Sequence, residues 1–435
     1  MNVLLIGDVA HTGFGRVTRE LAAGLMANHD VRVIGINHRG IAGELEAAMR
    51  RAEGSLSSRL ELATAALRAD PLLDVVIPAS ERGDGMGHNL TAPALDGALW
   101  PMWRPDALIM VADPKAMLMR LSHDGGALGR AVKRGVRLLN YVPIEGTGLP
   151  ESFRILWDHV TPIAMSDFGQ TQLEVLLERP VERIWHGVSP TFRPITAADP
   201  GTLEGQTVTS RDGAKRAIGM AGHTVVLRTD RFIFRKNYPA LFRVMRPVAA
   251  AHPEVITVIH TPLVDDDGRG DIRELISREP GAVHETGIEW AHPQIHLTRA
   301  HDSFKGISDD ALRVLYSAAD LYVSPTMAEG FGLCLAEALA CGTPVVATDY
   351  SAVSEVVGSG GVLIPPRDFL TNAYAHEWAL VDEAAMSAAV ERLISKPGER
   401  RSLGTAGRQH VARFSWTAAV EQFDRLLSQP AAVAA

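Results

Sequence analysis

Short runs of apolar residues alternate with longer segments of mixed polarity along most of the chain. The segments between the runs carry apolar residues at helical spacing, as in RVTRELAAGLMAN. Because the runs are apolar throughout, we expect parallel strands that are buried on both faces. This alternation predicts a doubly wound α/β domain. The runs in the first half cover residues 2–6, 31–36, 73–79, 107–112, 136–142 and 160–165.

A second series of the same kind follows a change of composition near residue 188. The segment GVSPTFRPITAADPGTLEGQTVTSRDG is rich in Pro, Gly, Ser and Thr, which is typical of an interdomain linker. From about residue 377 we expect helices, and Ser415 is a candidate N-cap of the last one. The chain should therefore form domains 1–188 and 189–414, followed by a helix at 415–430. The apolar runs of the second series cover residues 224–229, 255–261, 320–325, 344–348 and 361–365.

Composition and charge narrow the class of protein. Of the 435 residues, 46% are hydrophobic and 22% are charged, so there is ample apolar material for two cores. The formal net charge of −8 argues against a protein that lives on nucleic acid, because neutralising phosphates requires a concentrated Lys and Arg surface.

The cysteines and the N-terminus bear on the compartment. Cys334 and Cys341 lie on one expected helix, where a rise of about 1.5 Å per residue separates them by about 10 Å. A disulfide needs Cα atoms within about 7 Å, so we expect small buried residues in a reducing compartment. The first apolar run is too short for a signal sequence or a membrane span. We therefore expect a cytoplasmic protein without stable membrane insertion.

Open α/β sheets bind ligands at the loops that follow their strands, and three such loops carry candidate chemistry. In the first, GDVAHTGFGRVTREL, Gly13 and Gly15 precede a helix that we expect to begin near Arg16. Glycines let backbone amides approach a ligand, and a helix N-terminus favours anions. Because Thr18 occupies the third position of G-x-G-x-x-G, the dinucleotide fingerprint is incomplete. The loop covers a phosphate or an acceptor, or it is a plain tight turn.

The second loop, LRTDRFIFRKNYPALFRV, is basic and follows the expected strand at 224–229. Arg231 and Lys236 flank an apolar patch just before a helix. Two cations at the end of a central strand suit the diphosphate of a leaving group, whose developing charge they would neutralise. Arg235 is the rival of Lys236, and a solvated basic turn is the alternative to a binding site.

The third loop connects the expected strand at 320–325 to a helix from about Leu333 to Cys341. Glu329 precedes Gly330-Phe331-Gly332, where glycines expose amides at the helix N-terminus as a candidate anion site. Glu337 lies on a helix that is otherwise mostly apolar, where an unsatisfied carboxylate is costly. A bidentate hydrogen bond to the cis-diol of a ribose would satisfy this carboxylate. The third loop therefore predicts a binding site for a ligand that carries an anionic group and a ribose.

Glu329 and Glu337, with seven residues between them, resemble the E-x7-E motif of retaining GT-B glycosyltransferases, especially glycosyltransferase family 4. The resemblance continues through ISDDALRV…GVLIPP at residues 307–366. Arg231 and Lys236 match the family's Arg-x4-Lys pair, which favours Lys236 over Arg235.

Two further segments extend the resemblance. HGVSPTFRP (186–194) is similar to the family's segment entering the linker. FSWTAAVEQF (414–423) is similar to its closing helix, which crosses back to the N-terminal domain. The resemblance covers about residues 160–425, and the N-terminal half only in outline. It implies a GT-B architecture, in which two Rossmann-like domains face each other across a cleft.

The resemblance also implies roles for individual residues. Arg231 and Lys236 would hold the donor diphosphate, and Glu337 would bind the ribose hydroxyls. Glu329 would hold the donor sugar. The remaining donor-binding residues implied are Gly13, Gly15, Gly330, Phe331, Gly332 and Leu333.

One departure from the family concerns the acceptor side. Many members carry a His at the end of an N-domain strand, beside the transferred sugar, but the corresponding segment here is LLNYVPIEGTGLP. Glu145, or Asp113 in the earlier MVADP loop, is the candidate for that neighbourhood and for a catalytic role. The alternative is that Glu145 caps a turn.

The implied activity is transfer of a sugar from a nucleoside-diphosphate sugar to an acceptor hydroxyl with retention of configuration. A lipid, a glycan, a protein or a small molecule could be the acceptor, and the acidic net charge disfavours a modified nucleic-acid base. A nucleotide-sugar epimerase of the same fold and a non-catalytic nucleotide-sugar binding protein are the alternatives.

We expect neither a cofactor nor a metal. Asp265, Asp266 and Asp267 lie in a polar turn-rich segment and are interpreted as a solvated acidic turn. His292 and His296 lack helical spacing and a carboxylate that would complete a zinc site.

Overall fold

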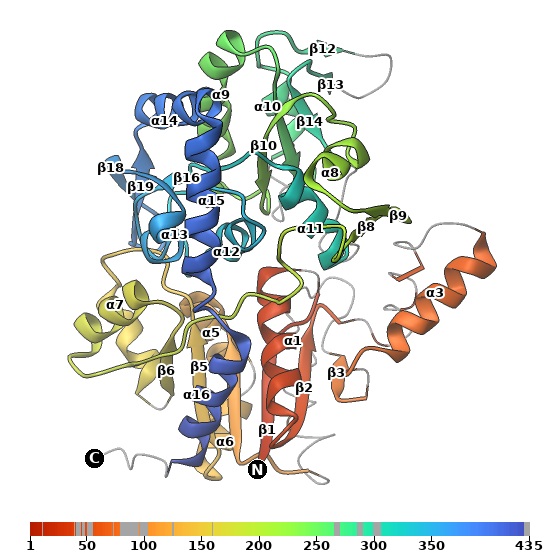
Figure 1. The fold of residues 1–435 in the computed structure, drawn as a ribbon. Helices are drawn as coiled ribbons and strands as arrows, with labels where there is room; N and C mark the ends of the chain where they lie inside the picture. The colour runs from red at the N-terminus through yellow and green to blue at the C-terminus, as the bar shows by residue number, and fades with distance from the viewer. Residues whose placement is uncertain are drawn as a thin grey trace.

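The computed structural model describes residues 1–10, 12–38, 40, 45, 48–49, 55–72, 74–78, 95, 103–123, 126–158, 160–264, 270–284, 290–298 and 306–429. They form two α/β domains stacked one above the other, with the N-terminal domain at the bottom of Figure 1. Two Rossmann-like domains are thereby confirmed.

The N-terminal sheet has seven parallel strands in the order β3-β2-β1-β4-β5-β6-β7. Each of the six predicted runs overlaps a strand, whereas β7 is a two-residue edge strand without an apolar run and was not predicted. The strands are β1 (Asn2–Asp8), β2 (Asp30–Ile36), β3 (Val76–Pro78), β4 (Ala107–Val111), β5 (Arg137–Val142), β6 (Thr161–Ala164) and β7 (Glu182–Arg183).

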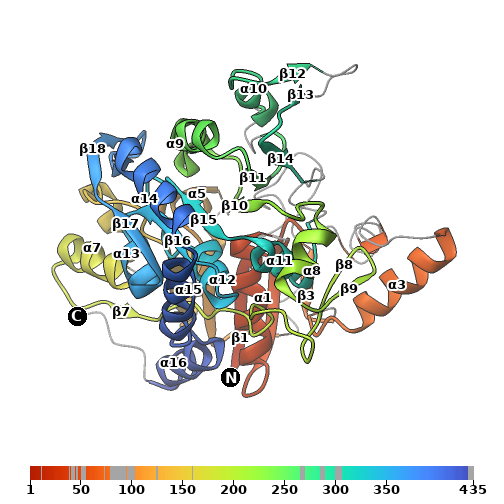
Figure 2. The same cartoon turned by 45° about the horizontal axis from the view of Figure 1, so that its top comes forward.

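Helices cover both faces of this sheet. One face packs against α1 (Gly13–Leu25) and against the C-terminal helix α16 (Trp416–Ser428). The other face packs against α5 (Pro114–His123), α6 (Ala127–Lys133), η2 (Glu151–Trp157) and α7 (Asp167–Leu177). Helix α3 (Leu56–Arg68) projects away from the domain (Figure 2).

The second sheet has six parallel strands in the order β14-β11-β10-β15-β16-β17. Helices α9, α10 and α14 contribute to the core on one face, and α11, α12 and α13 to that on the other, where α15 contacts α12. The strands are β10 (Thr224–Thr229), β11 (Val255–His260), β14 (Ile295–Leu297), β15 (Leu321–Ser324), β16 (Val345–Thr348) and β17 (Gly361–Ile364). The helices are α9 (Tyr238–Ala251), α10 (Ile272–Ile276), α11 (Asp309–Ala318), α12 (Leu333–Ala340), α13 (Val353–Val357), α14 (Glu383–Ser395) and α15 (Pro397–Val411).

Both sheets reverse their strand order at one point. The reversal lies between β1 and β4 in the first sheet and between β10 and β15 in the second. Ligands of open α/β sheets bind outside the carboxyl ends of the strands at this point. The loops after β1, β4, β10 and β15, which carry most of the predicted site residues, are therefore correctly placed for a ligand.

The expected linker is only partly irregular. It contains a short hairpin, β8 (Gly201–Leu203) and β9 (Gln206–Val208), and its last residues begin α8 (Arg211–Ala217). Ile195, Val208 and Ala214 are buried against α11. The hairpin and the helix start were not predicted, because a few spaced apolar residues, not a continuous run, pack them against the second domain.

A second hairpin replaces part of the helical region that we expected from about residue 377. Strands β18 (Pro366–Thr371) and β19 (Glu377–Val381) pair antiparallel, and the helix begins only at Glu383. The prediction was wrong for residues 377–381 because EWALV is too short to show whether its period is that of a helix or a strand.

The last helix lies on the first domain. Ser415 is its N-cap, as predicted, since its side chain accepts a hydrogen bond from the backbone amide of Ala418. Trp416, Phe423 and Leu427 are buried in the core that α1 shares. The domain boundaries at residues 188 and 414 stay predictions.

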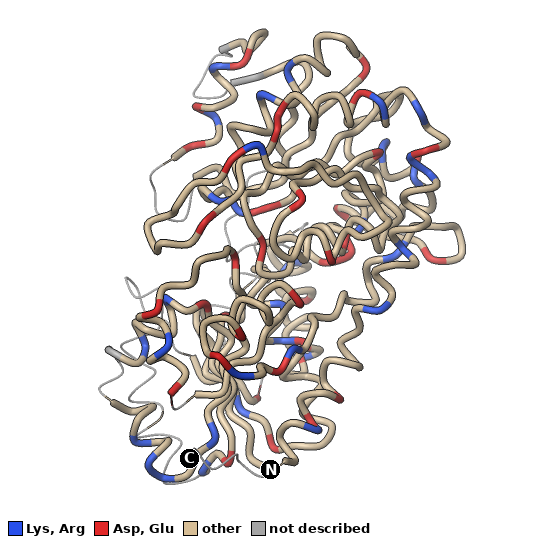
Figure 3. Tube along the Cα trace, turned by 90° about the vertical axis from the view of Figure 1, so that its left-hand side faces the viewer, with Lys and Arg blue, Asp and Glu red and all other residues tan. Residues whose placement is uncertain are grey.

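Neither the charges nor the helices of the described residues mark out a special surface, and the elements not yet named are short. Lys and Arg are interspersed with Asp and Glu in both domains (Figure 3). No helix in the described ranges has the length and apolar character that crossing a membrane requires. The short elements are β12 (Val283–His284), β13 (Trp290–Ala291), η3 (Phe234–Lys236) and η4 (Gly358–Gly360).

Candidate functional site

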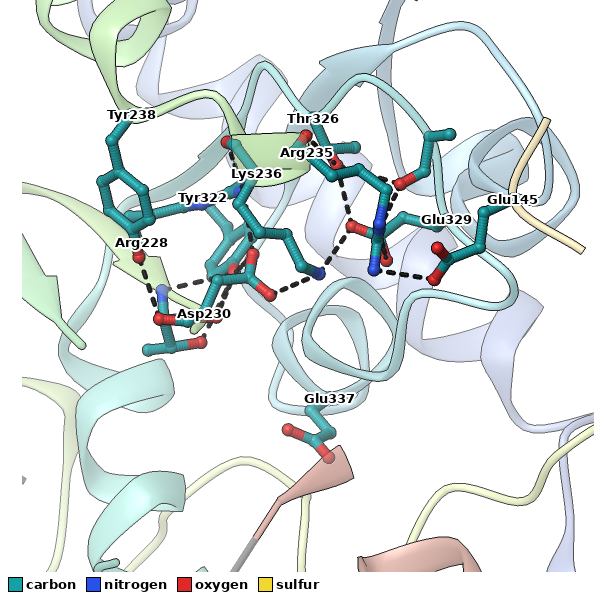
Figure 4. A network of polar contacts seen from close by, with 12 residues as sticks. Glu145, Arg228, Asp230, Arg235, Lys236, Tyr238, Tyr322, Thr326, Glu329 and Glu337 are labelled. Atoms are coloured by element: carbon teal, nitrogen blue, oxygen red, sulfur yellow. Dashed lines mark hydrogen bonds and ion pairs between the residues drawn. The ribbon is translucent and has the colours of Figure 1, made fainter. Parts of the chain in front are cut away.

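A chain of alternating charges lies at the carboxyl ends of β10 and β15 (Figure 4). The Lys236 ammonium group is 2.6 Å from a carboxylate oxygen of Asp230 and 2.7 Å from one of Glu329. Asp230 also pairs with the fully buried Arg228 at 2.8 Å. Lys236 therefore bridges the loop after β10 and the loop after β15.

Arg235 extends this series of ion pairs to the first domain. Its guanidinium group is 3.0 Å from Glu329 and 2.7 Å from Glu145, which follows β5. It also donates to the carbonyl oxygen of Ala328. Arg235, the rival of Lys236 in the sequence analysis, thus also contacts Glu329, at a slightly longer distance, and it makes the contact with Glu145.

A tight turn brings these groups together. After β10 the chain forms the short η3 helix, and Asn237 then adopts a left-handed backbone with φ of 53°. The Asn237 side chain accepts from the amide of Ala240 and caps α9. This turn folds Lys236 back toward Asp230 and places its ammonium group between Asp230 and Glu329.

Burial and neighbouring charges have opposite effects on the pKa values of the residues in these ion pairs. Burial alone would raise the pKa of Glu329, but Lys236 and Arg235 hold it well below its usual range. Burial raises the pKa of Glu145, and Arg235 only partly offsets this. Burial would lower the pKa of Lys236, yet Asp230 and Glu329 raise it. Lys236 therefore stays charged between two carboxylates.

Glu337 lies apart from this chain, and its side chain points away from it (Figure 4). It is 1% exposed and accepts hydrogen bonds from Arg16 of α1 and from the Tyr316 hydroxyl at 2.8 Å. Burial raises the pKa of Glu337 to about 7, although Arg16 opposes the shift. The buried carboxylate is thus satisfied as expected, but by protein groups in this structure.

Arg16 links the two domains and was not predicted as a site residue. It pairs with Asp309 at 2.9 Å as well as with Glu337, and it lies over the Phe192 ring at 5.2 Å. Only its position directly after the glycine-containing loop could have pointed to it.

A cavity of about 350 Å³ lies beside Arg16, between α1 and the start of α11. This volume is at the lower end of the range for small-molecule sites, about 300–1,000 Å³. Its lining residues include Thr12, Arg16, Arg19, Ser308 and Asp309.

The two predicted glycines of the first loop occupy different settings. Helix α1 begins at Gly13 and not near Arg16, with Thr12 as its N-cap. A side chain at Gly15 would overlap the carbonyl oxygen of Ala10, whereas one at Gly13 would meet only a methyl group 3.8 Å away. Gly15 therefore serves close backbone packing, while Gly13 borders open space.

The two glycines of the third loop, Gly330 and Gly332, also have different roles. A side chain at Gly330 would overlap Pro143 of the first domain, so this glycine permits contact between domains. Gly332 has a left-handed φ of 99° and precedes α12. Phe331 is buried between the rings of His186 and Phe414.

The other predicted residues lie around this loop. Leu333 packs against both domains. Arg231 is half-buried just before η3. Asp113 caps α5, accepting from the amide of Ala116 at 2.8 Å, and its charge acts on both Glu145 and His376. His376 is a buried residue of the hairpin β18–β19 that the sequence did not single out.

The structure describes some, but not all, of the residues that were considered as metal ligands. Among the described residues, no group of three or more His, Cys, Asp or Glu is arranged to hold a metal ion. Asp265, Asp266 and Asp267 lie outside the described residues. His292 contacts the carbonyl oxygen of Pro280 at 3.0 Å, and both cysteines are free thiols.

Comparison with known proteins finds similarity to glycosyl transferases. A sequence model of the family described as “Glycosyl transferases group 1” matches residues 281–395, which include Glu329 and Glu337. The alpha-maltose-1-phosphate synthase of Mycolicibacterium smegmatis is 31% identical over 186 residues, which are 40% of this chain and 41% of that protein. This chain thus spans less than half the length of that relative.

Solved structures extend the likeness to the whole chain. Sucrose-phosphate synthase from Thermosynechococcus elongatus superposes with a TM-score of 0.64 at 19% identity, covering 98% of each chain. HepE from Anabaena in complex with UDP and glucose gives a TM-score of 0.63 at 16% identity, covering 98% of this chain and 99% of that one. The predicted GT-B fold, and the resemblance to glycosyltransferases of that fold, are confirmed.

Proposed function

We propose that this chain, whose residues 281–395 match the group 1 glycosyl transferases, is a retaining glycosyltransferase that uses a nucleoside-diphosphate sugar. The observation that carries the proposal is the meeting of Glu329 with Lys236 and Arg235 at the carboxyl ends of β10 and β15. The relatives named above are a maltose-1-phosphate synthase and a sucrose-phosphate synthase, which favours transfer over epimerisation.

The donor diphosphate would lie against Arg231 and Lys236. As the bond between sugar and phosphate breaks, negative charge grows on the phosphate oxygens, and preorganised cations stabilise that charge. Lys236 is held between two carboxylates, so its position is fixed before the donor arrives. Glu329 would accept hydrogen bonds from the donor sugar while its contacts with both cations keep it ionised.

The donor ribose would bind to Glu337. Its carboxylate is on a buried helix, and the two hydroxyls of a ribose can replace the donors it now has. Arg16 would then release Glu337 and keep Asp309, beside the cavity between α1 and α11. Donor binding would thereby exchange a contact between domains for a contact with ligand.

Transfer would proceed on one face of the sugar. The acceptor hydroxyl attacks the anomeric carbon from the side that the diphosphate leaves, and the departing phosphate takes the proton. No protein nucleophile or metal is needed in this scheme. Glu145 and Asp113 would flank the acceptor, and closure of the two domains would align the reactants.

The proposal extends to the compartment and to the class of acceptor. We propose a cytoplasmic enzyme that acts on a lipid, glycan, protein or small-molecule hydroxyl without inserting stably into a membrane. Acidic net charge makes a modified nucleic-acid base the less favoured acceptor.

A panel of nucleoside-diphosphate sugars tests the proposal. Release of UDP, GDP or ADP is followed with and without acceptors, with a chelator present, and the product's anomeric configuration is read by NMR. We expect release of one nucleotide, unaffected by the chelator, and a product that retains the donor's configuration. Conversion of the donor to an epimer without any acceptor, or no binding of any donor, would contradict the proposal.

A further inference from the structure

The second domain holds the loop after β5 on both sides of Glu145. On one side, Pro143 lies so close to the backbone of Gly330 that a side chain at this glycine would overlap it. On the other side, the backbone amide of Thr147 donates a hydrogen bond to the Tyr350 hydroxyl at 2.9 Å. Glu145 thus lies on a short loop that is anchored to the other domain before and after it.

The Tyr350 hydroxyl joins this loop to the hairpin β18–β19. Besides accepting from the Thr147 amide, it lies 3.1 Å from the Thr147 hydroxyl and donates to the carbonyl oxygen of Glu377 in β19 at 2.8 Å. The amide of Glu377 in turn donates to the carbonyl oxygen of Thr147 at 3.0 Å. A side chain at Gly146 would overlap the Glu377 carbonyl oxygen, so this glycine permits the close approach. Tyr350, the hairpin and the loop of Glu145 therefore form one hydrogen-bonded unit.

Two aromatic rings, one from each domain, hold the Tyr350 ring in place. Its centroid is 5.7 Å from that of Phe168 in α7 and 5.4 Å from that of Phe369 in β18, and both contacts are edge-on. Edge-on aromatic pairs are favourable beyond the apolar area that they bury. The direction of the Tyr350 hydroxyl is therefore fixed by packing as well as by its hydrogen bonds.

The residue after Tyr350 ties the same turn to the donor side. The Ser351 hydroxyl accepts a hydrogen bond from the backbone amide of Glu329 at 2.8 Å. Ser351 has a left-handed backbone with φ of 56°, which bends the chain sharply before α13. Two adjacent side chains after β16 thus contact the loop of Glu329 and the loop of Glu145.

Glu145 is the group whose position this turn sets. Its carboxylate is 2.7 Å from Arg235 and its side chain is 27% exposed, so it is paired and also accessible to a ligand (Figure 4). In the proposed function, Glu145 flanks the acceptor and Glu329 holds the donor sugar. A misplacement of about 1 Å between reacting groups costs about 100-fold in rate, so the spacing of the two carboxylates matters for transfer.

We propose that Tyr350 is a positioning residue for glycosyl transfer, which fixes Glu145 relative to Glu329 and thereby aligns the acceptor with the donor sugar. The proposal rests on the proposed function and adds a residue that acts through Glu145 and not by contact with a substrate. Without the Tyr350 hydroxyl, the Thr147 amide and the Glu377 carbonyl oxygen lose a partner, and the loop that carries Glu145 shifts to regain one.

A double-mutant cycle with Tyr350→Phe and Glu145→Gln tests this role. The probes are UDP-glucose, GDP-mannose and ADP-glucose, with water or methyl α-D-glucopyranoside as the acceptor, and nucleotide release gives the rate. Each single variant should lower kcat by about 10-fold and keep nucleotide affinity within about twofold. Because both changes act on the same carboxylate, the double variant should also lose about 10-fold, and not the about 100-fold expected of independent residues.

Two further variants control the cycle. Tyr374→Phe removes the same atom at the tip of the same hairpin, where the hydroxyl accepts from Lys115 of α5. It should keep the parent's kcat and leave the effect of Glu145→Gln unchanged. Thr147→Val removes a hydroxyl beside Tyr350 but keeps both backbone hydrogen bonds, so it carries the test if Tyr350→Phe does not fold. It should lower kcat less than Tyr350→Phe does and show the same non-additivity with Glu145→Gln.

The outcomes separate this inference from the proposed function. Losses that add in the cycle, or a Tyr350→Phe variant with the parent's kcat, would overturn the role of Tyr350 and leave the transferase proposal standing. A Glu145→Gln variant with the parent's kcat would also overturn it, because Tyr350 would then have no group to position. If no nucleotide sugar in the panel binds, the transferase proposal itself is wrong.

Discussion

Glu329 and Glu337 belong to one motif, yet their surroundings drive them in opposite directions. Glu329 lies between Lys236 and Arg235, which hold its pKa below the usual range although it is buried. Glu337 has one cation, Arg16, and burial raises its pKa to about 7. At neutral pH, therefore, only Glu337 is close enough to its pKa to change charge.

This difference predicts a pH dependence of donor binding. The ionised carboxylate of Glu337 can accept from both ribose hydroxyls, so affinity for a nucleoside-diphosphate sugar should rise from pH 6 to pH 8. The donor's diphosphate loses no proton in this range, so the change reports on the protein. Calorimetry should show a flat profile in Glu337→Gln and affinity about 10- to 100-fold weaker than the parent's at pH 8. A parent profile as flat as that of the variant would contradict the role of Glu337.

The same pKa predicts a change in stability. A carboxyl whose pKa is raised on folding binds more protons in the native state, so its contribution to stability is lost as pH rises from about 4.5 to about 7. The shift corresponds to at most about 3 kcal/mol. Urea unfolding at pH 5 and pH 8 should show that Glu337→Gln loses less stability between them than the parent does. A larger loss in the variant would contradict the raised pKa.

Lys236 should matter more to folding than Glu145, which ends the same series of ion pairs. Lys236→Met leaves Asp230 and Glu329 facing each other without the cation between them, which should cost about 3–5 kcal/mol. Glu145→Gln leaves Arg235 paired with Glu329 and should cost about 1 kcal/mol. Urea unfolding of both variants checks the order, and equal losses would show that Lys236 does not connect the two carboxylates.

At the scale of elements, sequence reasoning succeeded where burial is complete on both faces. Strand β10 covers the predicted residues 224–229 because its central residues are apolar and buried, and its whole length pairs with β11. It failed at β19, whose five residues fit either period, and at the hairpin β8–β9, where apolar residues are few.

The site shows the same limit. The sequence located Glu337 and the need to satisfy it, but its partner Arg16 lies 321 positions away. His376 was missed for a related reason, because only the pairing of β18 with β19 brings it to the Glu145 loop. Loop positions follow from local pattern, whereas partners follow from the packing of two domains.

The two glycines at the start of α1 give a prediction for that element. Gly15→Ala should destabilise the chain by about 1–3 kcal/mol, because the added methyl group would overlap the carbonyl oxygen of Ala10. Gly13→Ala is the matched control, since its methyl group meets only Leu333 at 3.8 Å, and it should keep the parent's stability. Thermal unfolding checks both. If Gly13→Ala also lowers nucleotide affinity, Gly13 borders the donor as the family resemblance implies.

At the scale of the molecule, one of the polar contacts between the domains is placed at a helix end. Glu355 of α13 accepts from the amides of Asp167 and Phe168 in the first turn of α7, at 2.9 and 3.1 Å. Its carboxylate also accepts from the Trp185 indole at 3.1 Å. A negative charge at a helix N-terminus is favourable, so Glu355 stabilises the arrangement in which α13 contacts α7, here called closed.

Glu355→Ala should therefore open the molecule and separate donor binding from transfer. The proposed donor residues Lys236, Glu329 and Glu337 all belong to the second domain, so nucleotide affinity should stay within about twofold. Transfer, by contrast, needs Glu145 of the first domain near the donor. Because Glu355→Ala removes charge-assisted hydrogen bonds worth about 1.5–3 kcal/mol each, the transfer rate should fall by about tenfold or more.

Small-angle scattering and acceptor turnover test this opening together. The radius of gyration of Glu355→Ala should exceed that of the parent, and the difference should persist with saturating donor, because a ligand with equal affinity for both forms shifts neither. Glu383→Ala is the matched control, since it removes a carboxylate that pairs with Arg243 inside the second domain. Equal radii and equal transfer rates for the two variants would show that Glu355 does not set the closed arrangement. A larger radius with unchanged transfer would show that chemistry does not require the domains to close.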